Sequence, residues 1–180
     1  MPDRLLALRV DLMAKNPSLK HHLWNEDNIH ELGLNFADLC DQFPTLAGVS
    51  NAVRLKALLD RGGCYLDVDF LHLKPLDPFF ELNGPAACHQ EGDRLCNAFA
   101  VARKGEPWIK WQWDRIGEYR GVAAYWGVDL MTSAPRDGLT IVPRDLVFPW
   151  LFDDPPEKHI VKPWTIIAHL WEKSWVPKSQ

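Results

Sequence analysis

The chain has 180 residues, of which 47% are hydrophobic and 24% charged, which is enough for a domain with a buried core. Its formal net charge at pH 7 is -4 and no run of Lys or Arg occurs, so nucleic acid is not expected as a partner. No stretch reaches the roughly 18 apolar residues of a membrane-spanning helix, and charges stand near the first residue, where a signal peptide would be apolar. We therefore expect a soluble, cytoplasmic protein without a transmembrane segment.

The four cysteines are far apart and include no CxxC pair: they are Cys40, Cys64, Cys88 and Cys96. In a chain without an export signal, reduced and mostly buried thiols are expected, and a structural zinc site is the alternative. No repeat, low-complexity tract or Gly/Ser linker divides the sequence. We therefore treat residues 1–180 as one domain.

The first quarter of the sequence predicts short helices and one strand. Leucines at near-helical spacing predict a helix over residues 3–15, which an Asn-Pro pair ends. Residues 19–24 fit a short strand, and an Asn followed by acids favours a helix over residues 29–34. A further short helix is expected over residues 36–42.

The clearest local pattern is a helix followed at once by a strand. A helix over residues 50–61 carries apolar residues on one face and stops at two glycines. Residues 64–70 then alternate with period two, which places Tyr65, Asp67 and Asp69 on the face opposite the apolar residues. Two carboxylates and a phenol are therefore predicted to point the same way.

The rest of the sequence continues to alternate between strands and helices. Of the nine tryptophans, all but Trp24 lie beyond residue 107. Those of the predicted helix over 106–119 are expected in the core, and the alternative is a wall for a flat ligand. We expect strands over 86–89, 97–102, 139–142 and 165–170, and helices over 106–119 and 127–133. This alternation is typical of the α/β class.

Asp67 and Asp69 indicate a divalent cation site. Carboxylates two residues apart at the end of a buried strand suit Mg²⁺ or Mn²⁺, ions that also bind phosphate oxygens. In open α/β sheets, ligands gather at the carboxyl ends of the strands. A cation with a diphosphate is therefore the natural ligand, and a pair of solvated aspartates at a strand end is the ordinary alternative.

An ordered motif surrounds these aspartates. Residues 50–80 contain Arg54, Gly-Gly at 62–63, Tyr-Leu-Asp-x-Asp at 65–69 and Lys-Pro-Leu at 74–76. This segment resembles the DxD region of glycosyltransferase family thirty-two, which includes fungal initiating mannosyltransferases and capsule-synthesis enzymes. Further similar segments follow the family's order over most of the chain: Asn16-Pro17, Leu23-Trp24-Asn25, Asn97-Ala98-Phe99, Gly105-Glu106-Pro107, His169 and Ser174-Trp175.

The resemblance implies a GT-A-like, Rossmann-like α/β fold and a retaining transferase of the hexosyltransferase type. Such an enzyme moves a sugar from a nucleotide diphosphate sugar to a glycan, glycolipid or protein acceptor, with Mn²⁺ or Mg²⁺ as cofactor. Asp69 is implied to bind the metal directly, and Asp67 to contact the donor and reach the metal through water. His169 is implied to be the C-terminal contact to metal or diphosphate.

The remaining site residues are also implied by the resemblance. Arg54 is implied to take part in catalysis together with the two aspartates. Asn51 and Arg54 are implied to contact the donor sugar, and Tyr65 to lie near the nucleotide. Asn97 is implied to lie at the sugar and acceptor side, and Ser174 with Trp175 over the diphosphate. By themselves, Arg54 also suits an exposed helix position, and Tyr65 and His169 also suit a core.

Three departures from the family pattern lead to a second hypothesis. The family's N-terminal apolar strand is not found ahead of the helix over residues 3–15, Asn51 replaces an acid, and Gly127-Val128 replaces Gly-Pro. The alternative is a non-catalytic nucleotide-sugar-binding module, or one completed by a second copy or another subunit. A third interpretation is a phosphohydrolase in which Asp67 attacks phosphorus and Asp69 is acid and base, but the flanking residues do not fit it.

Overall fold

The computed structural model describes residues 2–122 and 126–172. Within these residues the strands form two sheets. A four-stranded sheet has the order β1 (Gly63–Leu66), β4 (Arg94–Ala102), β3 (Ala86–Glu91), β5 (Thr140–Val142). Neighbours in it are antiparallel except β3 and β5. A separate antiparallel pair consists of β2 (Phe70–His72) and β6 (Ile167–His169).

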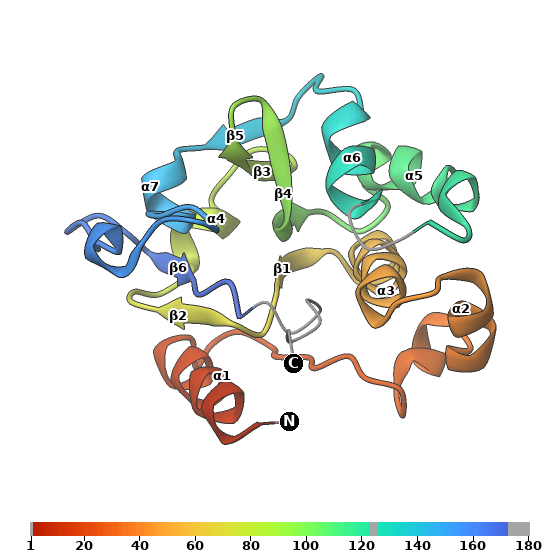
Figure 1. The fold of residues 1–180 in the computed structure, drawn as a ribbon, viewed down its shortest axis with the longest axis horizontal. Coiled ribbons are helices and arrows are strands. Elements are labelled where there is room, and N and C mark those ends of the chain that lie inside the picture. The colour runs from red at the N-terminus through yellow and green to blue at the C-terminus, as the bar shows by residue number, and fades with distance from the viewer. Residues whose placement is uncertain (1, 123–125, 173–180) are drawn as a thin grey trace.

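Helices cover both faces of the four-stranded sheet (Figure 1). The α-helices are α1 (Asp3–Lys15), α2 (Phe36–Gln42), α3 (Leu46–Arg61), α4 (Asp77–Phe80), α5 (Pro107–Trp113), α6 (Trp126–Ser133) and α7 (Arg144–Val147). Single 3₁₀ turns are η1 (Ile29–Leu32), η2 (Ile116–Tyr119) and η3 (Pro156–Lys158). One core joins α2, α3, α5 and α6 to the sheet, and the other joins α4, α7 and the β2–β6 pair to its opposite face. The fold is α/β, as predicted from the sequence.

Helix α3 leads directly into β1 and fixes where the aspartates begin. Thr45 accepts a hydrogen bond from the Gly48 N–H, so the helix starts four residues before the predicted Ser50. Gly62 ends it with φ +69°, and a Cβ there would lie 2.5 Å from the Lys104 nitrogen. Only glycine combines this backbone angle with this close approach.

The predicted strand over residues 64–70 is two strands. β1 ends at Leu66, the Asp67 N–H donates to the Ala98 carbonyl, and the chain turns before Phe70 begins β2. The division arises because the fully buried Phe70 belongs to the second core and pairs with His169. The predicted alternation holds as far as Asp67, because the Tyr65 hydroxyl reaches its carboxylate.

The structure confirms the helices over residues 3–15 and 36–42. Other predicted elements have different bounds. The helix over 29–34 is only the 3₁₀ turn η1, which ends at Gly33 with φ +68°. The helix over 106–119 is broken between Trp113 and Ile116.

The later predicted elements are present with shifted ends. β3 and β4 extend beyond 86–89 and 97–102, α6 starts one residue before 127–133, and β5 and β6 are shorter than 139–142 and 165–170. Helices α4 and α7 and the turn η3 were not predicted.

The predicted strand over residues 19–24 is wrong. These residues carry neither helix nor strand and pair with no strand of either sheet. None of the helices in the described part of the chain combines the length and the apolar character that a membrane crossing requires.

Candidate functional site

Three predicted metal ligands come together where the two sheets meet. Asp67 and Asp69 lie in the turn between β1 and β2, and His169 ends β6, opposite Phe70 in the antiparallel pair. One ligand atom from each of the three side chains lies within 4.8 Å of the others. They form the one group of at least three such side chains among residues 2–122 and 126–172.

Asp69 is held on both carboxylate oxygens. Its Oδ1 lies 3.1 Å from His169 Nε2, and its Oδ2 accepts from the Glu172 N–H at 3.0 Å. Burial raises the pKa of Asp69, but the hydrogen bonds and the positive charge of His169, together with the Glu172 N–H, outweigh it and leave the pKa below its usual value. Asp69 is therefore an anion at neutral pH, which a buried cation site requires.

His169 lies in an aromatic cage. Its ring centroid is 4.7 Å from that of Phe70 and 4.2 Å from that of Trp171, and Phe148 adds an edge contact. Because an ionised Asp69 can only accept, the proton of this contact is on Nε2. The buried Nδ1 has no hydrogen-bond partner among the described residues.

Trp171 adopts an unusual backbone conformation beside this histidine. Its φ is +54°, the only positive φ of a non-glycine residue in the described part of the chain. The residues on either side, Leu170 and Glu172, both donate backbone hydrogen bonds to Asp69. A bulky residue in this region carries strain of about 1–3 kcal/mol, so these contacts to Asp69 are maintained by the surrounding packing.

Asp67 is oriented by Arg54 and Tyr65. Its Oδ1 accepts from Arg54 Nη2 at 3.1 Å and from the Tyr65 hydroxyl at 2.8 Å. The guanidinium also lies over the Tyr65 ring, 4.6 Å from its centroid. Burial lowers the pKa of Arg54, but the charge of Asp67 and the contact with Tyr65 raise it above its ordinary value. Arg54 is therefore a permanent cation that fixes one oxygen of Asp67.

A buried amide network lies behind Arg54. The guanidinium also donates to the carbonyl of Asn97, and Asn97 Nδ2 donates to Asn51 Oδ1 at 2.8 Å. A Cβ on Gly127 would lie 2.1 Å from Asn97 Nδ2, so the backbone of α6 closes directly over the two amides. Gly127 is a site residue that sequence reasoning treated only as a departure from the family pattern; its place at the start of a predicted helix was the available signal.

The predicted donor contacts lie at different depths. Asn51 is 3% and Arg54 4% exposed, so both support Asp67 from within the protein. Tyr65 and Asn97 are half-buried beside them. Ser174 and Trp175 lie outside the described residues.

The fold and the acidic turn together define a class. A mixed α/β sheet with helices on both faces and paired aspartates after β1 is compatible with a GT-A-like, Rossmann-like domain. Residues 2–83 match the model of a family described as "Glycosyltransferase sugar-binding region containing DXD motif". This match supports the broad family of DXD-containing glycosyltransferases for the first part of the chain, and a glycosyltransferase-type domain for its function.

The match ends before Asn97 and His169. The structure places His169 against Asp69, and Asn97 against Arg54 and Asn51. Searches among curated proteins and among solved structures gave no match.

Proposed function

We propose that this chain is a metal-dependent, retaining glycosyltransferase of the hexosyltransferase type and of family thirty-two. It moves a sugar from a nucleotide diphosphate sugar to a glycan, glycolipid or protein acceptor, in the cytoplasm. The observation that carries the proposal is the convergence of Asp67, Asp69 and His169 within 4.8 Å. The two aspartates lie in the matched DXD segment.

The three side chains suit a divalent cation. Two carboxylates provide the oxygen ligands that Mn²⁺ and Mg²⁺ prefer, and an imidazole nitrogen is compatible with Mn²⁺. A cation bound to both Asp69 and His169 would replace the proton that they share. When bound, it would act as a Lewis acid at the diphosphate, where negative charge develops as the sugar leaves.

The chain's own residues position this site. Arg54 and Tyr65 hold one oxygen of Asp67, which leaves its second oxygen for a ligand. Glu172 and His169 fix both oxygens of Asp69. We assign no nucleophile or general base.

A second candidate function is a nucleotide-sugar-binding module that does not catalyse transfer or that needs a second polypeptide. The burial of Asn51 and Arg54 favours it, because neither side chain is open to a donor sugar. In this case a nucleotide diphosphate binds with metal, but no sugar is transferred.

Thermal unfolding with UDP or GDP, each with and without Mn²⁺, tests both functions. A nucleotide at about a hundred times its Kd stabilises the native state by roughly 2.7 kcal/mol, which raises the Tm by roughly 5–10 °C. Asp69→Asn should abolish this shift. Asp60→Asn is the matched control, because Asp60 pairs with Lys56 on α3, apart from the candidate site.

The outcomes distinguish the candidates. A metal-dependent shift together with release of the nucleotide from a UDP- or GDP-hexose supports the transferase. A metal-dependent shift without release supports the binding module. A shift that Asp69→Asn retains, or no shift with either nucleotide, contradicts both.

A further inference from the structure

Strand β1 is an edge strand with unpaired backbone groups. It pairs with β4 alone, and the bond from the Asp67 N–H to the Ala98 carbonyl sets which residues face β4. By the alternation of antiparallel pairs, Gly63 and Tyr65 face β4, and Cys64 and Leu66 direct their N–H and C=O groups outward. No described residue forms a backbone hydrogen bond with these outward groups.

A second stretch of unpaired backbone lies across a groove from β1. The groove has a volume of about 750 Å³, and residues 19–26 and 62–66 both line it. The backbone groups of residues 20–22 have no hydrogen-bond partner among the described residues. Residues 19–24 were predicted as a strand, yet no strand pairs with them. We call this space, between residues 19–26 and β1, the strand groove.

The remaining sides of the strand groove are largely apolar. Helix α3 contributes Val49, Val53 and Ala57, which belong to the first core. Leu12 and Leu76, which pack with the second core, line it as well. A segment placed there would be covered on both faces, so apolar side chains fit at successive positions, as in the buried strands of α/β proteins.

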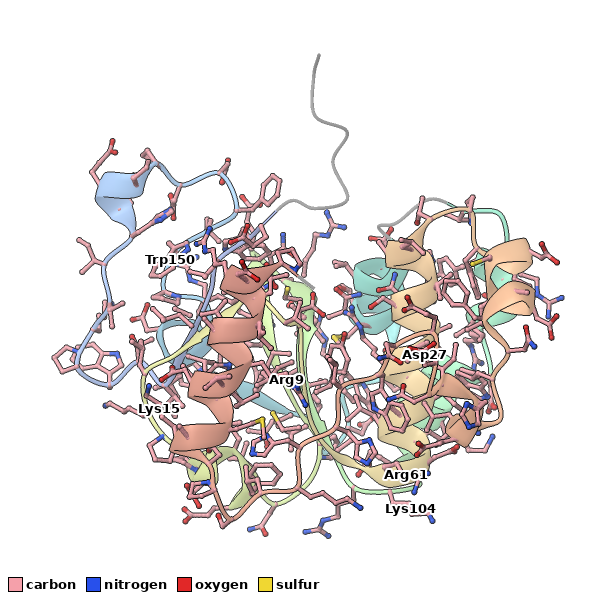
Figure 2. All side chains as sticks on the ribbon, turned by 90° about the horizontal axis from the view of Figure 1, so that it is seen from below. Arg9, Lys15, Asp27, Arg61, Lys104 and Trp150 are labelled. Atoms are coloured by element: carbon pink, nitrogen blue, oxygen red, sulfur yellow. The ribbon has the colours of Figure 1, made fainter. Side chains whose placement is uncertain are left out.

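One end of the strand groove is cationic. Arg61 and Gly62-Gly63 line both the strand groove and an adjoining cavity of about 320 Å³, which Arg103 and Lys104 also line. Arg61 and Lys104 lie at the same end of the molecule (Figure 2). The exposed side chains of Arg103 and Lys104 have no hydrogen-bond or ion-pair partner in the described part of the chain. Glu26 is the one described acid that lines either cavity.

We propose that the strand groove binds an extended, apolar segment of a partner polypeptide, with an acidic residue at the end beside Arg61. The segment adds to the sheet by hydrogen bonding to Cys64 and Leu66. β1 has four residues, so at about 3.3 Å per residue the paired length is about 13 Å, which corresponds to about four residues of the bound segment. This interaction does not depend on the transferase proposal.

A synthetic peptide tests the pairing. The probe is one Asp followed by five alternating Val and Ile residues and two Lys for solubility, and a second peptide has the reverse order. We expect one of them to slow amide hydrogen exchange at Cys64 and Leu66 by at least about tenfold at saturation. The same peptide N-methylated at alternate residues is the control, and it should give no protection.

The cationic end is tested separately. Arg61→Gln should weaken binding of the acidic peptide by about two- to fivefold, and it should not affect a peptide in which Asn replaces the Asp. Arg61 is half exposed and paired only weakly with Glu31, so the variant should fold normally.

Four results would overturn the proposal. The first is unchanged amide exchange at Cys64 and Leu66 with both peptides, and the second is equal binding of the N-methylated peptide. The third is protection of the same amides by UDP or GDP without any peptide. The fourth is protection of these amides that rises with protein concentration alone. The third identifies the strand groove as part of a nucleotide site, and the fourth identifies the occupant as a second copy of the chain.

Discussion

Gly127 offers a direct test of the network that supports Asp67. A Cβ at this position would lie 2.1 Å from Asn97 Nδ2 and 2.6 Å from Asn51 Cγ, so Gly127→Ala must displace at least one amide. Overpacking costs about 1–3 kcal/mol and loss of the Asn97–Asn51 hydrogen bond about 1 kcal/mol. The gain of alanine over glycine in a helix returns about 0.5–1 kcal/mol. The free energy of unfolding should therefore fall by about 1–3 kcal/mol.

Thermal unfolding followed by circular dichroism measures this loss. At about 2–4 °C per kcal/mol, the Tm of Gly127→Ala should fall by roughly 2–12 °C. Gly117→Ala is the matched control, because a Cβ there meets nothing within 4 Å. Its stability should change by less than about 0.5 kcal/mol.

A double variant separates the clash from a general effect on α6. Asn97→Ala removes the amide that a Cβ on Gly127 would strike, so Gly127→Ala should cost less in that background. Because the Asn97 carbonyl also accepts from Arg54, Gly127→Ala should reduce the metal-dependent stabilisation by UDP or GDP. Equal Tm values for the Gly127 and Gly117 variants, or strictly additive losses in the double variant, would refute the close packing described above.

Three further predictions concern pH and single hydrogen bonds. Burial lowers the pKa of His72 to about 4, so folding favours its neutral form. The stability contributed by this form is complete above pH 6.5 and is lost as the pH falls toward 4. In urea unfolding across that range, the free energy of unfolding should therefore fall by about 3 kcal/mol less in His72→Gln than in the unchanged protein. The pKa of Asp69 is also lowered, so its contribution to the stability is present above about pH 4 and is lost as the pH falls through the folded-state pKa. In Asp69→Asn, the Tm should therefore fall less steeply with decreasing pH. An unchanged dependence of Tm on pH would contradict the contacts with His169 and Glu172. Tyr65→Phe removes the hydroxyl that donates to Asp67, so it should lower the free energy of unfolding by about 0.5–1.5 kcal/mol and weaken Mn²⁺ binding in a calorimetric titration. If the stability and the Mn²⁺ affinity were both unchanged, the hydroxyl would not hold Asp67.

The local structure around the aspartates was predictable because its signals are local. The glycines after α3 and the alternation through Asp67 depend only on neighbouring residues, and both predictions hold. The turn before Phe70 was not predictable from alternation, because it depends on which core receives that side chain. The wrong strand over residues 19–24 has the same cause, since a strand also needs a neighbour.

The candidate site required contacts between distant parts of the chain. His169 meets Asp69 across 100 positions of sequence through the β2–β6 pair, and only the family resemblance indicated this association beforehand. The positions of Asn51 and Arg54 three residues apart placed them on one helix face. Their burial could not be predicted, because it depends on the approach of Gly127 from α6.

The turn at residues 67–69 also joins two separately packed halves of the molecule. Through Arg54, Asp67 is tied to the core around α3, whereas Asp69 and His169 belong to the core around Phe70 and Phe148. An ion held by all three would be a non-covalent cross-link between these halves. Strands β3 and β4 already contribute residues to both cores, and cation binding would add a second link between them at the turn.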